Sequence, residues 1–290
     1  MNIGVNQIEL QRHILEWLEE DMPFGDATTD AIIDKTVLGA GDLIAKEAGI
    51  LCGIDVFAQI YKCIDSQVKL EVAIHDGMAI EAGDVIARVH GPIGSILKGE
   101  RLGLNIMQRL SGIASMAHQY FEAVKPYDTV IVDTRKTTPG FRSLEKYAVR
   151  TGGCMNHRFS LSDAVMIKDN HIAAAGSITE AVKRAKASVA HTMKIEVEVE
   201  TFNELREVIH TGVDIIMLDN MTTDQIRRAV RFVKEHAKKM IALEASGNMT
   251  LERVAEVAAT GVDVISVGAL THSVHALDIS LKFEKPVVKS

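Results

Sequence analysis

The chain has few cysteines, no basic excess and no long apolar run. Its 290 residues contain three cysteines, Cys52, Cys63 and Cys154, and they form no CxxC pair. Because the number of cysteines is odd and they form no close pairs, a disulfide framework is not expected. Free cysteines of this kind are typical of proteins in a reducing compartment. No segment approaches the roughly 18 consecutive apolar residues of a membrane span, and the first residues do not form a signal peptide. The sequence therefore predicts a cytoplasmic protein that is not bound to membranes.

The charge balance sets the kind of ligand site to expect. There are 32 Lys and Arg residues against 39 Asp and Glu residues, which gives a net charge of −7. Nucleic acid or an anionic membrane surface would need a broad basic face, so neither is an expected partner. An anionic ligand must instead be held by a local group of cations. With 47% hydrophobic residues, the chain is able to form one large domain or two modest ones.

The first part of the chain has an α+β pattern. Residues 6–20 carry Ile8, Ile14, Leu15 and Leu18 on roughly one face of an expected amphipathic helix. A second helix is expected near 56–64, and short apolar runs predict local strands at 43–45, 68–74 and 85–89. After Gly91-Pro92 a long helical pattern begins, which we interpret as the joint between two domains.

From residue 128 onward strands and helices alternate, which is the rhythm of a parallel sheet or barrel. The expected strands are 129–133, 164–168, 194–199, 214–219, 240–245 and 263–267. The expected helices are 143–150, 178–189, 203–210, 223–237 and 251–259. A complete (β/α)8 barrel needs eight strands, so either the barrel is incomplete or two strands escape the pattern. The strand-like tail at 279–283 follows no helix and is expected to return to the first domain.

Each of the six expected strands ends in polar residues or glycine, and such ends meet at one edge of a parallel barrel. The cations Arg135, Lys136, Arg158 and Lys168 lie near the ends of the first two strands. Arginine suits carboxylate or phosphate oxygens and lysine acts as a point charge, so a ligand with several negative charges is implied. The alternative is that each cation is neutralised by a neighbouring acid such as Asp133, Asp163 or Asp169.

Two acids and two small-residue turns follow on the later strands. Glu198 and Asp219 suit Mg²⁺ shared with substrate phosphates, or sugar hydroxyls, or a glycosidase-like acid and base pair. The two turns are Ser246-Gly247-Asn248 and Ser266-Val267-Gly268-Ala269, each before an expected helix start. Backbone N–H groups at such positions bind phosphate, although tight turns that need glycine would give the same pattern.

Three other chemistries are open to these residues. Lys168 at a strand end is able to form a Schiff base, but the arginines nearby would supply charge that this reaction does not need. His272 and His275 have a zinc-like spacing without a third ligand close in sequence. Cys154 has His157 three residues on but no other support as a nucleophile.

Taken together, the motifs resemble those of the quinolinate phosphoribosyltransferase family, over nearly the whole chain. The resemblance is carried by DTRKTTPGFRSLEKYAVRTGG, NHRFSLSDAVMIKDNHI, EVEVET, IMLDNM and LEASGNM, with GERLGLNIMQRLSGIAS around Arg101. It implies transfer of phosphoribose from phosphoribosyl pyrophosphate to quinolinate, with Mg²⁺, giving nicotinate mononucleotide, pyrophosphate and CO2. The rivals are a related phosphoribosyltransferase with another acceptor and a non-catalytic anion-binding protein.

The resemblance also implies the type II phosphoribosyltransferase architecture. An N-terminal α/β sandwich domain would span 1–115 and be rejoined by the tail 273–290, and an incomplete α/β barrel with the active site would span 116–272. The expected assembly is a homodimer, or a higher oligomer built from it, in which each site takes residues from the partner's N-terminal domain.

The resemblance also implies roles for individual residues. Arg135, Arg158 and Lys168 match the positions that hold the quinolinate carboxylates, with Lys136 and His157 beside them. Arg101 matches an arginine that reaches in from the other subunit. Lys136, Lys168, Glu198 and Asp219 are the expected catalytic groups, and the last two are also the expected metal or ribose ligands, directly or through water. The expected phosphate ligands are Ser246, Gly247, Asn248 and Gly268. Departures from the family pattern at Phe141 and Cys154-Met155 affect the expected loop shape.

Overall fold

The computed structural model describes residues 5–283, and its contacts divide the chain into two compact units. Unit 1 comprises Met1–His118, Thr138–Gly153 and Ser273–Ser290, and unit 2 comprises Gln119–Thr137 and Cys154–His272. The segment Thr138–Gly153, which the sequence reading assigned to the barrel, therefore groups with unit 1. Packing explains this grouping, because the Gly152 backbone lies directly against the Ala114 carbonyl of unit 1. Of the predicted tail, residues 284–290 lie outside the described part.

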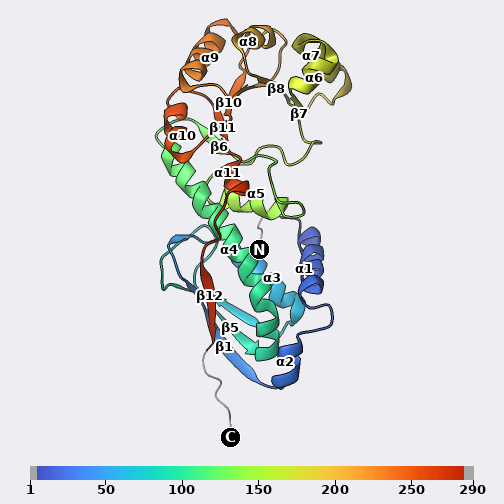
Figure 1. Cartoon of the computed structure of the whole chain (residues 1–290), viewed down its shortest axis with the longest axis vertical. Helices are drawn as coiled ribbons and strands as arrows, with labels where there is room; N and C mark the ends of the chain where they lie inside the picture. The colour runs from blue at the N-terminus through green and yellow to red at the C-terminus, as the bar shows by residue number, and fades with distance from the viewer. Residues whose placement is uncertain (1–4, 284–290) are drawn as a thin grey trace. The chain divides into compact units, whose positions relative to one another are not determined.

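Unit 1 is built on an antiparallel sheet in the order β12-β1-β5-β3. Its strands are β1 (Leu38–Ala45), β3 (Lys69–Val72), β5 (Val85–Pro92) and β12 (Ile279–Phe283). A small separate pair is formed by β2 (Gly49–Ile50) and β4 (Ala79–Ile80). The strand β12 lies beside β1, with Leu281 opposite Leu43, so the end of the chain completes a sheet that its beginning starts (Figure 1).

The helices of unit 1 are α1 (Gln7–Asp21), α2 (Ala27–Ile32), α3 (Ile54–Ile64), α5 (Arg142–Thr151) and α4 (Ile93–Val124), which continues into unit 2. The buried face of α1 is Leu10, Ile14 and Leu18, at a spacing of four residues. The predicted face was therefore partly wrong, because Ile8 and Leu15 point to solvent. Phe57 and Tyr61 of α3 are fully buried against the sheet in the core of the unit.

Unit 2 contains six parallel strands in the order β6-β11-β10-β9-β8-β7. They are β6 (Val130–Val132), β7 (Val165–Ile167), β8 (Ile195–Val199), β9 (Ile215–Asp219), β10 (Ala242–Ser246) and β11 (Val264–Ser266). Among the described residues β6 and β7 are not paired, so the barrel is open between them. The strand count left this possibility open, and the family resemblance implied it. Met155 forms an isolated parallel bridge to Val132 on the free side of β6.

Helices follow the strands of unit 2 and lie around the outside of the sheet (Figure 1). They are α6 (Asp169–Ala175), α7 (Ile178–Ser188), α8 (Phe202–Val208), α9 (Thr223–His236), α10 (Leu251–Ala258) and α11 (Ala269–His272). Capping boxes begin two of them, from Thr201 for α8 and from Thr222 for α9. The pattern missed α6, which buries no residue, and α11, which has four residues. Within the described range, no helix combines the length and apolar character that crossing a membrane requires.

Candidate active site

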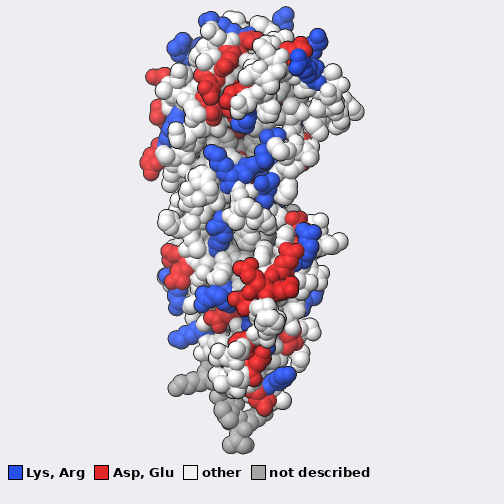
Figure 2. All heavy atoms as spheres, turned by 45° about the vertical axis from the view of Figure 1, so that its right-hand side comes forward, with Lys and Arg blue, Asp and Glu red and all other residues white. Residues whose placement is uncertain are grey.

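A cavity of about 700 Å³ opens at the carboxyl ends of the six strands, and every residue that lines it belongs to unit 2. Such a volume suits small-molecule ligands. A space-filling view shows Lys and Arg side chains gathered around a hollow, with Asp and Glu side chains nearby (Figure 2). The lining contains all but one of the predicted site residues: Arg135, Lys136, His157, Arg158, Lys168, Glu198, Asp219, Ser246, Gly247, Asn248 and Gly268. The exception is Arg101, which is exposed on α4 in unit 1.

Three cations of the pocket are not neutralised by neighbouring acids. Within the described chain, Arg135, Lys136 and Arg158 have no carboxylate within 4.0 Å. The Arg158 guanidinium donates to the Ala164 carbonyl at 2.8 Å, and its pKa is lowered by partial burial and then by Arg135. Its sequence neighbour Asp163 accepts from the Phe159 backbone at 2.6 Å instead. These positive charges are therefore available to an anionic ligand.

Lys168 is the cation of the pocket that has an acidic partner. It follows β7, and its ammonium group pairs with the Glu198 carboxylate at the end of the neighbouring strand β8. The Glu198 side chain is largely buried, whereas that of Lys168 is 42% exposed. Asp219, at the end of β9, accepts a hydrogen bond from the Asn220 amide at 2.7 Å and has no cation partner among the described residues.

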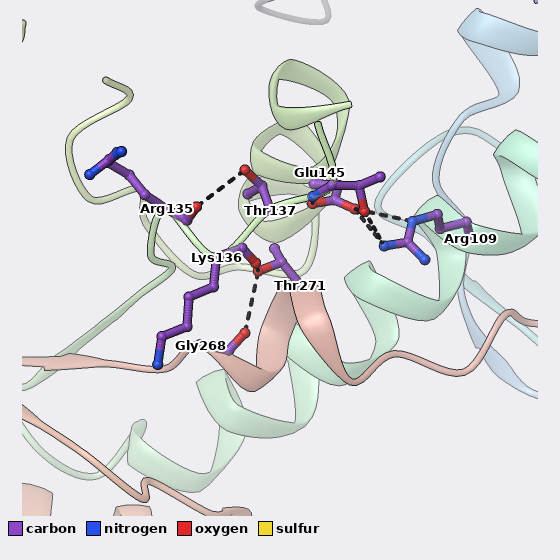
Figure 3. Close-up of polar contacts among 8 residues, drawn as sticks. Arg109, Arg135, Lys136, Thr137, Glu145, Gly268 and Thr271 are labelled. Atoms are coloured by element: carbon purple, nitrogen blue, oxygen red, sulfur yellow. Dashed lines mark hydrogen bonds and ion pairs between the residues drawn. The ribbon is translucent and has the colours of Figure 1, made fainter. Parts of the chain in front are cut away.

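The loop that carries Arg135 and Lys136 is held by a residue that the sequence reading did not select. The Thr271 hydroxyl lies 2.8 Å from the Lys136 carbonyl oxygen and 3.3 Å from the Gly268 carbonyl oxygen (Figure 3). It therefore ties the end of β6 to the turn after β11. No sequence signal marks this role, because the acceptors are backbone groups.

The loop continues into unit 1, where a buried acid holds its far end. The Thr138 backbone N–H donates to Glu145 at 3.1 Å, and the Arg109 guanidinium donates to the same carboxylate at 2.6 Å (Figure 3). Glu145 lies on α5 and is fully buried. Its interaction with Arg109 offsets the cost of removing the charge from water.

The predicted phosphate end has the backbone geometry of tight turns. Gly247 has φ +91°, and a Cβ atom there would lie 2.2 Å from the Asn220 side-chain oxygen, so only glycine fits. The Arg253 guanidinium donates to the carbonyl oxygens of Met221 at 2.6 Å and Gly247 at 3.1 Å, joining the turns after β9 and β10. Sequence reasoning missed Arg253, which lies on α10 behind the motif.

His157 is held between two buried acids. Its Nε2 lies 3.3 Å from a Glu196 oxygen and 3.4 Å from a Glu244 oxygen, while its Nδ1 accepts the Arg158 backbone N–H at 2.7 Å. Burial acts to lower the pKa of His157, while Glu196 and Glu244 act to raise it. Burial raises the pKa of Glu196, and the hydrogen bond with His157 opposes this shift. Because Nδ1 accepts a hydrogen bond, the ring proton lies on Nε2, between the two carboxylates.

The structure gives little support to Cys154 as a nucleophile or to His272 and His275 as zinc ligands. Cys154 is buried, and burial followed by Asp133 raises its pKa to about 12, which is opposite to what a nucleophile needs. His272 lines the cavity, whereas His275 belongs to unit 1. Within residues 5–283 the one group of three His, Cys, Asp or Glu side chains spaced for a metal is His157, Glu196 and Glu244.

Phe141 and Met155, which depart from the family pattern, each contact another part of their own unit. The Phe141 ring packs on Trp17 with ring centroids 5.5 Å apart, within unit 1. Met155 is 59% exposed and extends the sheet edge through its bridge to Val132.

An open parallel α/β barrel with cations, acids and glycine turns at one mouth defines an enzyme for small polyanionic substrates. Two family models match the chain, "Quinolinate phosphoribosyl transferase, N-terminal domain" over residues 26–111 and "Quinolinate phosphoribosyl transferase, C-terminal domain" over residues 113–282. The chain belongs to the quinolinate phosphoribosyl transferase family.

Individual relatives agree over nearly their full length. The chain is 46% identical over 267 residues to a protein from Synechocystis named "Probable nicotinate-nucleotide pyrophosphorylase [carboxylating]", covering 92% of this chain and 90% of that one. It is 41% identical to "Quinolinate phosphoribosyltransferase [decarboxylating] 1b" of Nicotiana tabacum, covering 92% and 80%. The crystal structure of NadC from Streptococcus pyogenes matches with a TM-score of 0.91 at 40% identity, covering 97% and 99%.

Proposed function

We infer that the pocket of unit 2 carries out the reaction of this family. The enzyme transfers phosphoribose from phosphoribosyl pyrophosphate to the ring nitrogen of quinolinate and releases pyrophosphate and CO2, giving nicotinate mononucleotide for NAD biosynthesis. The observation that carries the assignment is the set of unneutralised cations, Arg135, Lys136 and Arg158, in the cavity of an acidic protein. A dicarboxylate and a phosphorylated sugar both require such charge.

The two substrates would occupy opposite sides of the mouth. Arg135, Arg158 and Lys168 bind the quinolinate carboxylates, with Lys136 and His157 beside them. Ser246, Gly247, Asn248 and Gly268 bind the phosphate, through backbone N–H groups and the serine hydroxyl. All of these residues line the same cavity, which supports their use in one site.

Transfer begins when the quinolinate nitrogen approaches the anomeric carbon of the ribose. The new N–C bond forms as the C–O bond to pyrophosphate breaks, and positive charge develops on the ribose. Glu198 and Asp219 stabilise this charge or hold the ribose hydroxyls, and Lys136 and Lys168 stabilise the negative charge of the reacting groups. No covalent bond to the protein is needed.

Decarboxylation follows from the charge of the product ring. The N-alkylated ring is cationic, so it accepts the electron pair of the breaking C–CO2 bond, and the ring carbon then takes up a proton. The protein has to hold the second carboxylate in place and does not need to provide an electron acceptor.

We propose that the reaction uses Mg²⁺, held by Asp219 and Glu198 directly or through water. The donor set fits, because carboxylates at a cavity that takes pyrophosphate are the oxygen ligands that Mg²⁺ shares with substrate. When bound, the ion neutralises charge on the leaving pyrophosphate. Asp219 has no competing cation in the described chain, whereas Glu198 would have to leave Lys168.

We further propose a homodimer in which Arg101 acts in the partner's pocket. The support is that Arg101 is exposed and belongs to unit 1, while the cavity lining belongs to unit 2. Dimers would be the building blocks of any higher oligomer. We also propose a cytoplasmic location, which the three free thiols support.

The deciding experiment supplies quinolinate, phosphoribosyl pyrophosphate and Mg²⁺ to the purified protein and omits each in turn. Pyrophosphate and CO2 are expected in equal amounts, and only when both organic substrates are present. Use of another pyridine carboxylate in place of quinolinate would indicate a related transferase with a different acceptor. Borohydride trapping of substrate on Lys168 would indicate Schiff-base chemistry, and ligand binding without pyrophosphate release would indicate a non-catalytic protein.

A further inference from the structure

Two buried acids that the reaction above does not use lie against His157, and one of them, Glu244, lines the pocket. Glu196 on β8 and Glu244 on β10 are 1% and 2% exposed, and Met217 of the intervening strand β9 lies opposite Glu244. Burying two carboxylates beneath a site that binds anions is costly unless they do something there. In each, one oxygen has no hydrogen-bond partner in the described chain, and the other lies close to His157 Nε2.

His157 uses both of its ring nitrogens inside the protein. Nε2 lies between the two glutamates, and Nδ1 accepts the Arg158 backbone N–H. The His157 backbone N–H in turn donates to Asp133 at 2.9 Å, at the end of β6. Three strands, β6, β8 and β10, therefore fix one residue from three directions.

The same arrangement fixes the next residue. Arg158 is joined to His157 by the chain and by the hydrogen bond to Nδ1, and its guanidinium is held by the Ala164 carbonyl and, at 3.6 Å, by the Met166 sulfur. No acid within 4.0 Å in the described chain orients it. The orientation of this cation thus depends on its backbone anchor.

We propose that Glu196 and Glu244 are positioning residues for the carboxylate-binding wall of the pocket, because they hold His157 and, through His157, the Arg158 backbone. The proposal rests on the proposed function, since it assumes that this wall binds quinolinate. It also gives His157, which the family resemblance places beside the carboxylate-binding cations, the part of positioning Arg158.

A metal ion is the competing explanation of the same three side chains, whose ligand atoms lie within 4.8 Å of one another. Nε2 faces the two oxygens at 3.3 and 3.4 Å, slightly longer than the usual range of N–H···O hydrogen bonds. A metal ion would have to replace the proton on Nε2, and two ligands at about 2.1 Å from one ion would be separated from each other by a distance similar to these. Metal analysis of the purified enzyme therefore distinguishes the two explanations.

The test compares leucine and glutamine at both positions in the full-length enzyme. Glu196→Leu and Glu244→Leu should each raise KM for quinolinate about tenfold and change KM for phosphoribosyl pyrophosphate less than about twofold. Glu196→Gln and Glu244→Gln should stay within about threefold of wild type, because the amide oxygen still accepts from Nε2. Glu200→Gln, an exposed glutamate just beyond β8, is the control and should have no effect.

Several results would overturn the proposal. Leucine variants that lose thermal stability but keep the wild-type KM for quinolinate would show a purely structural role. If the leucine variants do not fold, the isosteric double variant Glu196→Gln/Glu244→Gln decides, because it leaves His157 no charged acceptor whereas each single variant leaves one. Its KM for quinolinate is expected to rise about fivefold, and an unchanged KM is the contrary result. Stoichiometric metal in the wild type that this double variant loses would assign the site to an ion. Failure of the wild type to use quinolinate would instead overturn the proposed function.

Discussion

Lys168 pairs with Glu198 across the carboxyl ends of β7 and β8, so an expected quinolinate ligand forms an ion pair with an expected metal or ribose ligand. Substrate binding would redistribute this pair, because the carboxylates of quinolinate compete for Lys168 and the ribose or an ion competes for Glu198. The pair thus links the two halves of the site.

Replacement of Arg135 should weaken use of quinolinate most directly. Arg135→Ala is expected to lower kcat/KM for quinolinate by about 10²-fold or more, because a charge-assisted contact to a carboxylate is lost. Steady-state rates with varied quinolinate measure the effect. Arg231→Ala, an exposed position on α9, is the matched control. An unchanged kcat/KM would remove Arg135 from the substrate site.

The two acids of the mouth should differ in their response to Mg²⁺. Asp219→Asn should raise the Mg²⁺ concentration for half-maximal rate by about tenfold, since Asp219 has no other cation partner in the described chain. Glu198→Gln should have a smaller effect, because wild-type Glu198 must first leave Lys168. Magnesium titrations of the initial rate separate the two variants. Identical half-saturation in Asp219→Asn and wild type would contradict metal binding by Asp219.

Loss of Arg253 should affect the phosphate end of the site selectively. Arg253→Ala removes donors to the Met221 and Gly247 carbonyls, so the turn after β10 loses its support. KM for phosphoribosyl pyrophosphate should rise about tenfold while KM for quinolinate changes little. Arg253→Lys should fall between wild type and alanine, because lysine provides one point of contact. Equal changes in both KM values would argue for general loosening of unit 2.

The ion pair under α5 should be visible in stability. Arg109→Ala leaves the fully buried Glu145 without its cation and should lower the free energy of unfolding by about 3 kcal/mol. The double variant Arg109→Leu/Glu145→Leu should lose less, because no charge remains buried. Urea denaturation followed by circular dichroism measures both. A double variant less stable than Arg109→Ala would show that the hydrogen bonds that Thr138 donates to Glu145 dominate.

Thiol chemistry should report burial and pKa together. Burial raises the pKa of all three cysteines, to about 12 for Cys154, so at pH 8 only about 10⁻⁴ of that thiol is thiolate. Iodoacetamide should modify the half-buried Cys63 first and reach Cys52 and Cys154 only after unfolding. Mass spectrometry of timed digests gives the order. Fast labelling of Cys154 in the native enzyme would contradict its burial.

The six strands and four of the helices of unit 2 were predictable because local patterns encode them. Apolar runs of three to five residues, capping residues such as Thr222, and glycines soon after a helix, such as Gly212 and Gly261, are readable without any partner. The site cations were predictable for the same reason, since parallel strands end at one edge and therefore bring Arg135 and Lys168 together. The family resemblance added Arg101, which no pattern distinguishes from an ordinary exposed helix residue.

The sequence by itself thus determined the fold class, the family and the chemical character of the pocket. Only the tertiary structure decided that Lys168 pairs with Glu198 and that Thr271 and Arg253 support the two turns. The physical reason is that these contacts join distant segments, often through backbone carbonyls that leave no side-chain pattern. The two glutamates around His157 are the clearest case, because they become one cluster only when β8 and β10 bring them together.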